Sequence, residues 1–173
     1  MDATPVDHRS RIRIRPLTRD ERAPVRTVFA GMSQRSRYLR FHSPLPKLPS
    51  PTERLLTDVD GRRHAALVVE RAGTSGWIPL AIGRLIRTGD GVAEVAFEVV
   101  DEWHGRGIGR LLLTALSHRA AQLGYREVVA LVLAENRRAL ALVRSVFPEV
   151  QVRRSGATVE MTAFVTEPIA SAA

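Results

Sequence analysis

VAEVAFEVVDEWHGRGIGRLLL, residues 92–113, passes from an alternating segment through a glycine-rich turn into a run of leucines. Alternation of side chains between two faces over 92–100 is typical of a strand, and apolar residues at helical spacing over 107–123 predict a helix. Backbone N–H groups at the start of a helix lack an intrahelical partner and lie at the positive end of its dipole. A strand, a glycine turn and a helix in this order therefore predict a site for a phosphate-bearing ligand, in particular a pyrophosphate.

The turn contains three glycines and two arginines, namely Gly105, Gly107, Gly109, Arg106 and Arg110. The glycines would let the backbone approach an anion, and the arginines would add positive charge at its rim. A P-loop is excluded because no Gly-Lys-Ser/Thr follows. A dinucleotide site needs G-x-G-x-x-G, and the chain has G-x-G-x-G. That alternative stays open, with Glu135 near the place of a ribose-binding carboxylate, although no parallel βαβ repeat precedes the turn.

Strands and helices alternate along the rest of the chain. We expect strands at 12–16, 64–71, 77–87, 92–100, 127–133 and 157–165, of which 127–133 reads as buried on both faces. We expect helices at 19–31 (capped by Thr18, with Glu21 completing a capping box), 33–41, 51–58, 107–123 and 136–146. Proline makes 42–51 a loop. The predicted fold is α/β, with a mixed, mostly antiparallel central sheet flanked by helices, in one domain over 1–173 with its core at about 12–165.

Composition narrows the functional classes. The 26 basic and 18 acidic residues give a net charge of +8, but the arginines are scattered and aromatic residues make up only 5%, so we expect no nucleic-acid partner. No cysteine is present, which excludes a disulfide, a thiolate metal site and a cysteine nucleophile. The five histidines lack a metal-binding spacing, so no metal is expected. We find no signal peptide or membrane span and expect a cytoplasmic protein.

Residues 93–113, AEVAFEVVDEWHGRGIGRLLL, resemble motif A of the GCN5-related N-acetyltransferase (GNAT) superfamily, Q/R-x-x-G-x-G/A after a strand that often begins Ala-Glu. Leu133, Asn136, Ala139 and Leu142 are similar to the superfamily's second cofactor-binding block, so the resemblance spans about 12–165. SQRSRYLRFHSPLPKLPSP, residues 33–51, also resembles bacterial protein-lysine acetyltransferases of the Pat-like branch.

The resemblance implies that the chain binds acetyl-CoA as the acetyl donor. Its pyrophosphate would lie on the amides from Gly105 through Ile108 to Arg110, and its pantetheine arm would pair with the backbone from Phe97 to Val99. Asn136 and Ala139, on one helix face, would flank the pantetheine. Asn136 is equally interpreted as the plain N-cap of its helix, a role that does not exclude the first.

Two carboxylates share one face of the strand over 92–100, because alternation places Glu94 and Glu98 on the same side. The resemblance implies that Glu94 is the general base, acting through a water, and burial in a partly apolar cleft would suit that role. The alternative interpretation is that both carboxylates face solvent, and it applies above all to Glu98.

The sequence departs from the superfamily pattern at two positions. His104 occupies the usual Gln/Arg position, and Val143 stands where a tyrosine often protonates the departing thiolate. No general acid is therefore visible, which leaves room for a non-catalytic binder. We expect the strands at 64–71, 77–87 and 92–100 to form an antiparallel meander. Four residues lie in the helical region before it, where the superfamily's acceptor site is usually walled, and they could hold an acidic or peptide substrate: Arg37, Tyr38, Arg40 and His42.

The predicted function is an acetyl-CoA-dependent N-acetyltransferase that transfers directly to a primary amine, without a covalent enzyme intermediate. The N-terminal resemblance favours a protein lysine as acceptor. A small amine, such as a polyamine or an amine-bearing antibiotic, and a CoA-sensing or nucleic-acid-associated binding module remain alternatives. The sequence leaves the oligomeric state open, a homodimer included.

Overall fold

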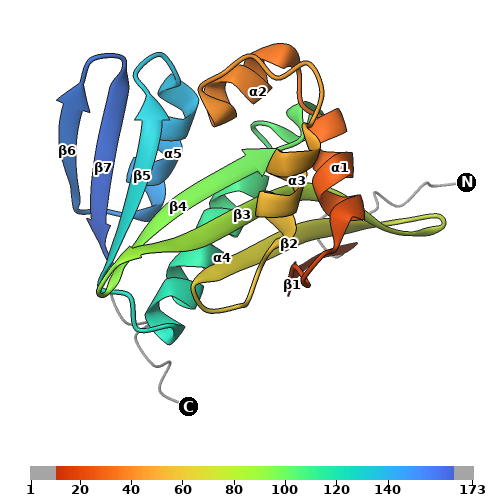
Figure 1. Ribbon diagram of the computed structural model, residues 1–173, viewed down its shortest axis with the longest axis horizontal. Coiled ribbons are helices and arrows are strands. Elements are labelled where there is room, and N and C mark those ends of the chain that lie inside the picture. The colour runs from red at the N-terminus through yellow and green to blue at the C-terminus, as the bar shows by residue number, and fades with distance from the viewer. Residues whose placement is uncertain (1–10, 166–173) are drawn as a thin grey trace, which may run out of the picture.

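The computed structural model describes residues 11–165, which form a mixed sheet with the strand order β1-β2-β3-β4-β5-β7-β6 (Figure 1). The strands are β1 (Ile12–Pro16), β2 (His64–Gly73), β3 (Gly76–Gly89), β4 (Val92–Val99), β5 (Glu127–Leu133), β6 (Val150–Ser155) and β7 (Thr158–Phe164). The helices are α1 (Arg22–Ala30), α2 (Gln34–Phe41), α3 (Ser50–Thr57), α4 (Ile108–Gln122) and α5 (Arg137–Val146). Each neighbouring pair of strands is antiparallel except β4 and β5, which confirms the predicted fold class.

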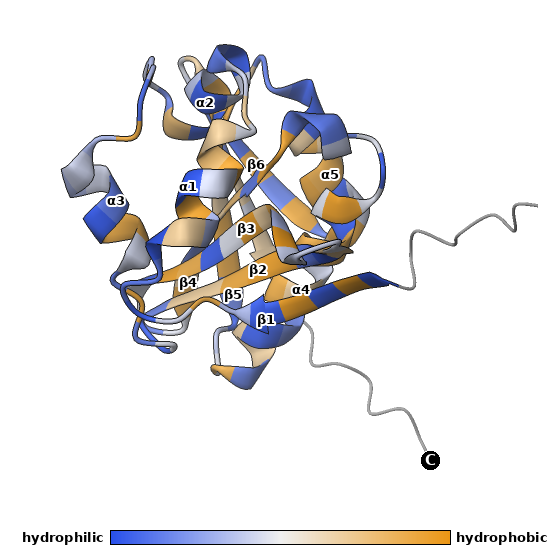
Figure 2. Ribbon diagram, turned by 90° about the vertical axis from the view of Figure 1, so that its right-hand side faces the viewer, coloured by the Kyte–Doolittle hydropathy of each residue, from blue (hydrophilic) through white to orange (hydrophobic). Residues whose placement is uncertain are grey.

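Helices cover both faces of the sheet, with a hydrophobic core on each side. Leu85 and Val95 pack with Leu112 and Leu116 of α4 on one face. On the opposite face α1 contributes to a smaller core, which consists of Leu17, Val25, Val28, Val59, Ala66, Val68 and Ile82. In Figure 2 apolar residues run through the strands at the centre, whereas α2 is mostly hydrophilic. The alternation along β2 thus separates the two cores, with Leu67 and Val69 on one side and Ala66 and Val68 on the other.

The first helix starts three residues later than its pattern predicts. Asp20 has a φ of 60°, a left-handed conformation that a helix cannot contain, and α1 begins at Arg22 with Glu21 as its N-cap. The Glu21 carboxylate still accepts hydrogen bonds from the backbone N–H and hydroxyl of Thr18, each at 3.0 Å. The predicted pairing of Thr18 with Glu21 is therefore present, but it closes a turn before the helix.

Two strands differ from expectation. β5 was expected to be buried on both faces, yet Leu131 is 43% exposed because its face of the strand opens into a cleft. β6 was missed by the sequence prediction. Most of its residues are exposed, since it is an edge strand paired only with β7, and Val150 and Val152 alternate too briefly to indicate a strand.

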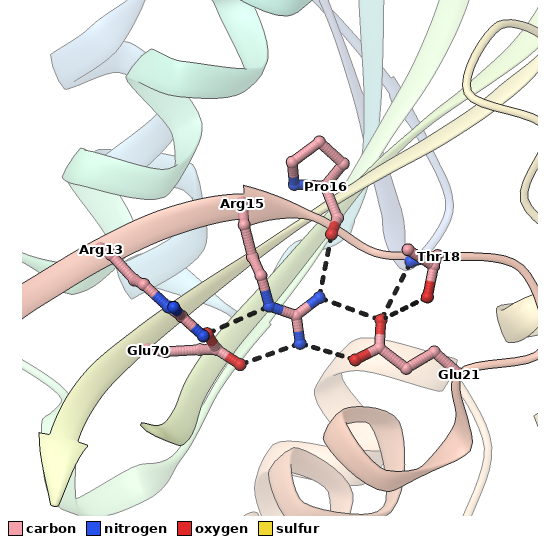
Figure 3. A network of polar contacts seen from close by, with 6 residues as sticks. All are labelled: Arg13, Arg15, Pro16, Thr18, Glu21 and Glu70. Carbon is pink, nitrogen blue, oxygen red and sulfur yellow. Dashed lines mark hydrogen bonds and ion pairs between the residues drawn. The ribbon is translucent and has the colours of Figure 1, made fainter. Parts of the chain in front are cut away.

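The edge strand β1 is fastened to its neighbours by charge (Figure 3). Glu70 of β2 accepts hydrogen bonds from Arg13, at 2.8 Å, and from Arg15, which also forms an ion pair with Glu21 at 2.6 Å. Hydrogen bonding by Arg15 lowers the pKa of Glu21 to about 2. We call Arg13, Arg15 and Glu70 the Glu70 cluster; it lies on the β1 edge of the sheet.

The described residues contain neither a candidate membrane-spanning helix nor a candidate metal site. No helix between residues 11 and 165 is long and apolar enough to cross a membrane. Nor does that part of the chain bring together three histidine, aspartate or glutamate side chains in a group that could bind a metal ion.

Candidate active site

The two strands of the single parallel pair diverge (Figure 1), and side chains on both of them line a cleft. β4 and β5 pair only from Val92 to Glu94, opposite Glu127 to Val129. Beyond these residues the facing edges of the two strands are not paired with each other in the described structure, so their backbone N–H and C=O groups border the cleft. The cleft has a volume of about 970 Å³, and Phe97 and Val99 of β4 line it.

The glycine turn forms one end of this cleft. Gly105 and Gly107 have φ angles of 73° and 83°, which residues other than glycine rarely adopt. A Cβ at either position would have no atom within 4 Å, so the space beside both residues is open. Gly107 is the N-cap of α4, and its carbonyl accepts the first helical bond from the N–H of Leu111, at 3.0 Å. The N–H groups of residues 108–110 therefore lack intrahelical acceptors, an arrangement that favours an anion at the start of a helix.

The other residues of the turn divide into three roles. A Cβ at Gly109 would lie 2.8 Å from Leu142 Cδ2, so this glycine also serves the close packing of α4 on α5. Ile108 is buried in the core and offers only its backbone. Arg110 lines the cleft, whereas Arg106 lies over the ring of Trp103, 5.1 Å from its centroid, and is not among the lining residues. Of the two predicted rim arginines, the structure brings Arg110 to the cleft.

His104 lines the cleft with both ring nitrogens engaged. Its Nδ1 accepts a hydrogen bond from Arg138 Nη1 at 2.7 Å, which assigns the proton to Nε2, and Nε2 donates to the Val99 carbonyl at 3.1 Å. The ring thus fixes the turn to the end of β4. Arg138 also lines the cleft, and the sequence analysis missed it.

Asn136 and Ala139 line the cleft on the side of α5. The Asn136 side-chain oxygen accepts a hydrogen bond from the Ala139 N–H at 3.1 Å, so Asn136 is an N-cap. The preceding residue, Glu135, forms an ion pair with Arg35 of α2 at 2.6 Å.

The dinucleotide alternative, in which Glu135 would bind a ribose, needs a sheet built from parallel βαβ units. The sheet of the described residues has one parallel pair, so its topology does not fit that alternative.

Glu98 is buried between two arginines, so its expected exposure to solvent is wrong. It is 5% exposed and forms ion pairs with Arg84 of β3 and with Arg40 of α2, the latter at 2.8 Å. Burial alone would raise the pKa of Glu98, but the charges of Arg84 and Arg40 outweigh it and hold the pKa below its ordinary value. A carboxylate whose pKa is lowered in this way binds a proton weakly, so Glu98 is a poor general base near neutral pH.

Arg84 is the most buried member of this group. It is 0% exposed, and its Nε and Nη2 have no hydrogen-bond partner among the described residues. The only sequence signal was the interruption of an apolar run, LAIGRLI at residues 80–86, by a single charge that needs a buried partner. We call Arg40, Arg84 and Glu98 the Glu98 cluster.

Glu94 differs from Glu98 although both lie on one face of β4. It lines the cleft at the point where the pairing of β4 with β5 ends, and it forms no salt bridge with any residue between 11 and 165. Val143, at the position of the family's tyrosine, is 1% exposed in the core and carries no proton donor. Among the described residues, the cleft is therefore lined by two carboxylates without an arginine partner, Glu94 and Asp101, and it has no tyrosine at that helical position.

The four residues expected at the acceptor side separate in space. Arg40 and His42 line the cleft. Arg37 donates to the carbonyls of Phe29 and Pro46, at 3.1 and 2.8 Å, and so braces the neighbouring loop. Tyr38 is not a lining residue. Arg35, which the sequence analysis passed over, lines the cleft instead.

Known proteins share this fold and sequence pattern. The sequence profile of the acetyltransferase (GNAT) family matches residues 35–147. Acetyltransferase Pat of Mycolicibacterium smegmatis is 37% identical over 109 residues, which cover 60% of this chain and 31% of that protein. This chain thus spans about a third of the length of that curated relative.

Two solved structures extend the comparison. The GNAT domain of S. lividans PAT has a TM-score of 0.78 and 26% identity, over 88% of this chain and 90% of that chain. Spermidine N-acetyltransferase from Vibrio cholerae, solved in complex with CoA and spermine, has a TM-score of 0.66 and 17% identity, over 90% and 96% of the two chains. At that identity the likeness concerns the fold alone.

Proposed function

The chain belongs to the acetyltransferase (GNAT) family, and from this premise we propose that it transfers the acetyl group of acetyl-CoA directly to the side-chain amine of a protein lysine. One observation carries the proposal. A single cleft joins the unpaired edge of β4, the glycine turn at the start of α4, and Glu94. These are the parts that binding a long phosphorylated thioester and deprotonating an amine require.

The residues present fit acetyl-CoA. Gly105 and Gly107 leave open space where side chains would stand, and the first N–H groups of α4 suit a pyrophosphate, with Arg110 and Arg138 nearby as cations. The open edge of β4 offers hydrogen-bonding groups to the amides of a pantetheine arm. Bound acetyl-CoA supplies a thioester carbonyl that a neutral amine can attack.

Glu94 is the residue we assign to proton transfer. A lysine amine is protonated at neutral pH and must lose a proton before its nitrogen can bond to the carbonyl carbon. Glu94 accepts that proton, through one water, before the amine attacks. The nitrogen then forms its bond to the carbonyl carbon and releases a second proton to solvent as the C–S bond breaks. Val143 cannot protonate the leaving sulfur, so this chain leaves that step to solvent. A thiol has a pKa of about 8.5, and a thiolate is therefore a tolerable leaving group.

The charge of the cleft favours a peptide lysine over a polyamine. A polyamine carries several positive charges and needs several carboxylates that are not neutralised. The lining carboxylates are Glu94, Glu98 and Asp101, and two arginines neutralise Glu98. The likeness to the S. lividans PAT domain and to Acetyltransferase Pat supports the same choice.

An acceptor panel tests the proposal. The purified chain is incubated with acetyl-CoA and either lysine peptides or spermidine, and CoA release and acetylated products are measured. We expect acetylated lysine peptides and little acetylspermidine. Turnover with spermidine alone would contradict the peptide acceptor. Binding of acetyl-CoA without turnover on any amine would favour the non-catalytic alternative.

A further inference from the structure

Helix α2 forms the acceptor side of the cleft without belonging to either core. None of its residues from Gln34 to Phe41 is buried. A helix of eight residues has little stability of its own, so its place must come from contacts with the rest of the chain. Phe41 packs against the buried ring of Phe29, with the ring centroids 6.0 Å apart, and arginines supply the longer polar contacts. The position of the helix therefore depends in part on hydrogen bonds and charge.

Three arginine contacts hold the helix in different directions. Arg37 reaches the carbonyls of Phe29 and Pro46, behind the cleft. Arg35 reaches Glu135 on the opposite side, but both side chains are about half exposed, and such pairs contribute little. Arg40 reaches Glu98, a buried carboxylate that Arg84 also holds. The last contact is thus the best shielded from water.

The Glu98 cluster therefore links the helix to the strand that carries Glu94. Glu94 and Glu98 lie on one face of β4, four residues and about 13 Å apart at 3.3 Å per residue. Since Arg84 fixes the Glu98 carboxylate to β3, Arg40 sets the separation between α2 and Glu94. An acceptor that enters the cleft must fit within this separation.

We infer that Glu98 and Arg40 are positioning residues for the acceptor. They hold α2 in register with Glu94, take no part in proton transfer, and govern the binding of the amine substrate rather than that of acetyl-CoA. The inference rests on the proposed function, because it takes α2 as the acceptor wall. It assigns Glu98 a role different from that of Glu94, although the two carboxylates share a strand face.

Arg40→Gln is the sharpest test, because it leaves the buried Arg84–Glu98 pair intact. Arg13→Gln is its matched control, since it likewise removes one of two arginines from a buried glutamate, Glu70, and leaves the other. We expect Arg40→Gln to raise the KM for a lysine peptide about tenfold, the effect of one charge-assisted hydrogen bond, with the KM for acetyl-CoA unchanged. Arg40→Lys keeps a charged donor and should restore part of the loss, whereas Arg13→Gln should alter neither KM.

Amide hydrogen exchange supplies a readout that needs no turnover. The N–H of His42, which donates to the Tyr38 carbonyl at 2.8 Å, reports on the end of α2. It should exchange about tenfold faster in Arg40→Gln and at the wild-type rate in Arg13→Gln. Unchanged exchange and unchanged peptide KM would overturn the inference, and so would an equal rise in both KM values. If the wild type acetylates no amine, the proposed function fails and exchange alone decides whether Arg40 positions α2.

Discussion

Glu70 and Glu98 are both buried, and each lies between two arginines, but the two clusters solve the problem differently. In the Glu70 cluster both arginines are partly exposed, and Arg15 also reaches Glu21 and the Pro16 carbonyl (Figure 3). In the Glu98 cluster Arg84 is fully buried and has two N–H groups without a partner among the described residues. Every buried polar side-chain atom of the Glu70 cluster has a hydrogen-bond partner, whereas the Glu98 cluster leaves two buried N–H groups of Arg84 unpaired among the described residues.

The difference separates a structural contact from one that belongs to a site. Leaving buried donors unpaired costs free energy, and natural proteins break such local rules mainly where function requires it. The Glu70 cluster fastens an edge strand, and solvent can hydrate its arginines. The Glu98 cluster lies beside the cleft, where its charges fix the acceptor wall. Each of the following substitutions tests one side of this contrast.

The largest expected effect is on stability. Glu98→Gln leaves Arg84 buried without a counter-charge, so we expect a loss of about 3–5 kcal/mol in the free energy of unfolding. Glu70→Gln should cost about 1 kcal/mol, because Arg13 and Arg15 can turn to water and Arg15 keeps Glu21. Urea unfolding followed by circular dichroism measures both. Equal losses of unfolding free energy in the two variants would show that the burial of Arg84 does not add to the cost of removing its counter-charge.

The next effect is on catalysis. Glu94→Gln removes the one lining glutamate without an arginine partner, and kcat with a lysine peptide should fall about 100-fold, as expected for loss of a general base. Acetyl-CoA affinity should stay at the wild-type value, and so should the unfolding free energy, which Glu98→Gln is expected to lower. Isothermal titration and steady-state kinetics give these quantities. Unchanged turnover would remove Glu94 from the mechanism.

A smaller effect concerns the cofactor end, away from both clusters. Saturation with acetyl-CoA at about 100 times its Kd should add roughly 2.7 kcal/mol and raise the melting temperature by several degrees. Gly107→Glu places a negative charge at the anion site and should abolish that shift. Gly107→Ala is the control, since it introduces the same backbone strain without the charge, and Glu70→Gln should keep the full shift. A shift with NAD or ATP equal to that with acetyl-CoA would contradict the assignment.

The smallest effect is the acid sensitivity of the β1 edge. The pKa of Glu21 is lowered to about 2 from 4.5, chiefly by hydrogen bonding to Arg15, so the pair stabilises the fold above pH 4.5. That contribution disappears as the pH falls through 2 and should amount to about 1 kcal/mol at this partly exposed site. Unfolding free energies of wild type and Arg15→Gln should therefore differ at pH 6 and converge near pH 2. A constant difference would assign the effect to packing.

Local chemistry explains what the sequence predicted well. Gly105 and Gly107 need left-handed backbone, a requirement that glycine itself announces, and the leucines after them mark the helix. The meander, the start of α4 and the cap at Asn136 follow from similar short-range patterns, and the predicted family was confirmed. The roles of the individual site residues stay predictions.

Contacts between distant segments explain what was missed. Arg35 and Glu135 are 100 residues apart, and no local pattern joins them. Glu98 was expected in solvent because its strand alternates, yet α2 covers that part of the face and delivers Arg40. Arg138 could not be told from its exposed neighbour Arg137 until the position of His104 was known. Side-chain partners across the cleft thus required the three-dimensional arrangement.

The early end of the β4–β5 pairing has a consequence for solubility. Unpaired strand edges normally invite other chains to add a strand, which leads to aggregation. Here β4 and β5 turn their open edges toward each other, and α2 and α5 stand beside the gap. A narrow extended ligand can reach these edges, whereas a strand that is already part of another folded sheet is too bulky to enter. The unpaired N–H and C=O groups of β4 and β5 therefore stay available to a ligand in the cleft, while edge-to-edge pairing with another copy of the chain is disfavoured at these two edges.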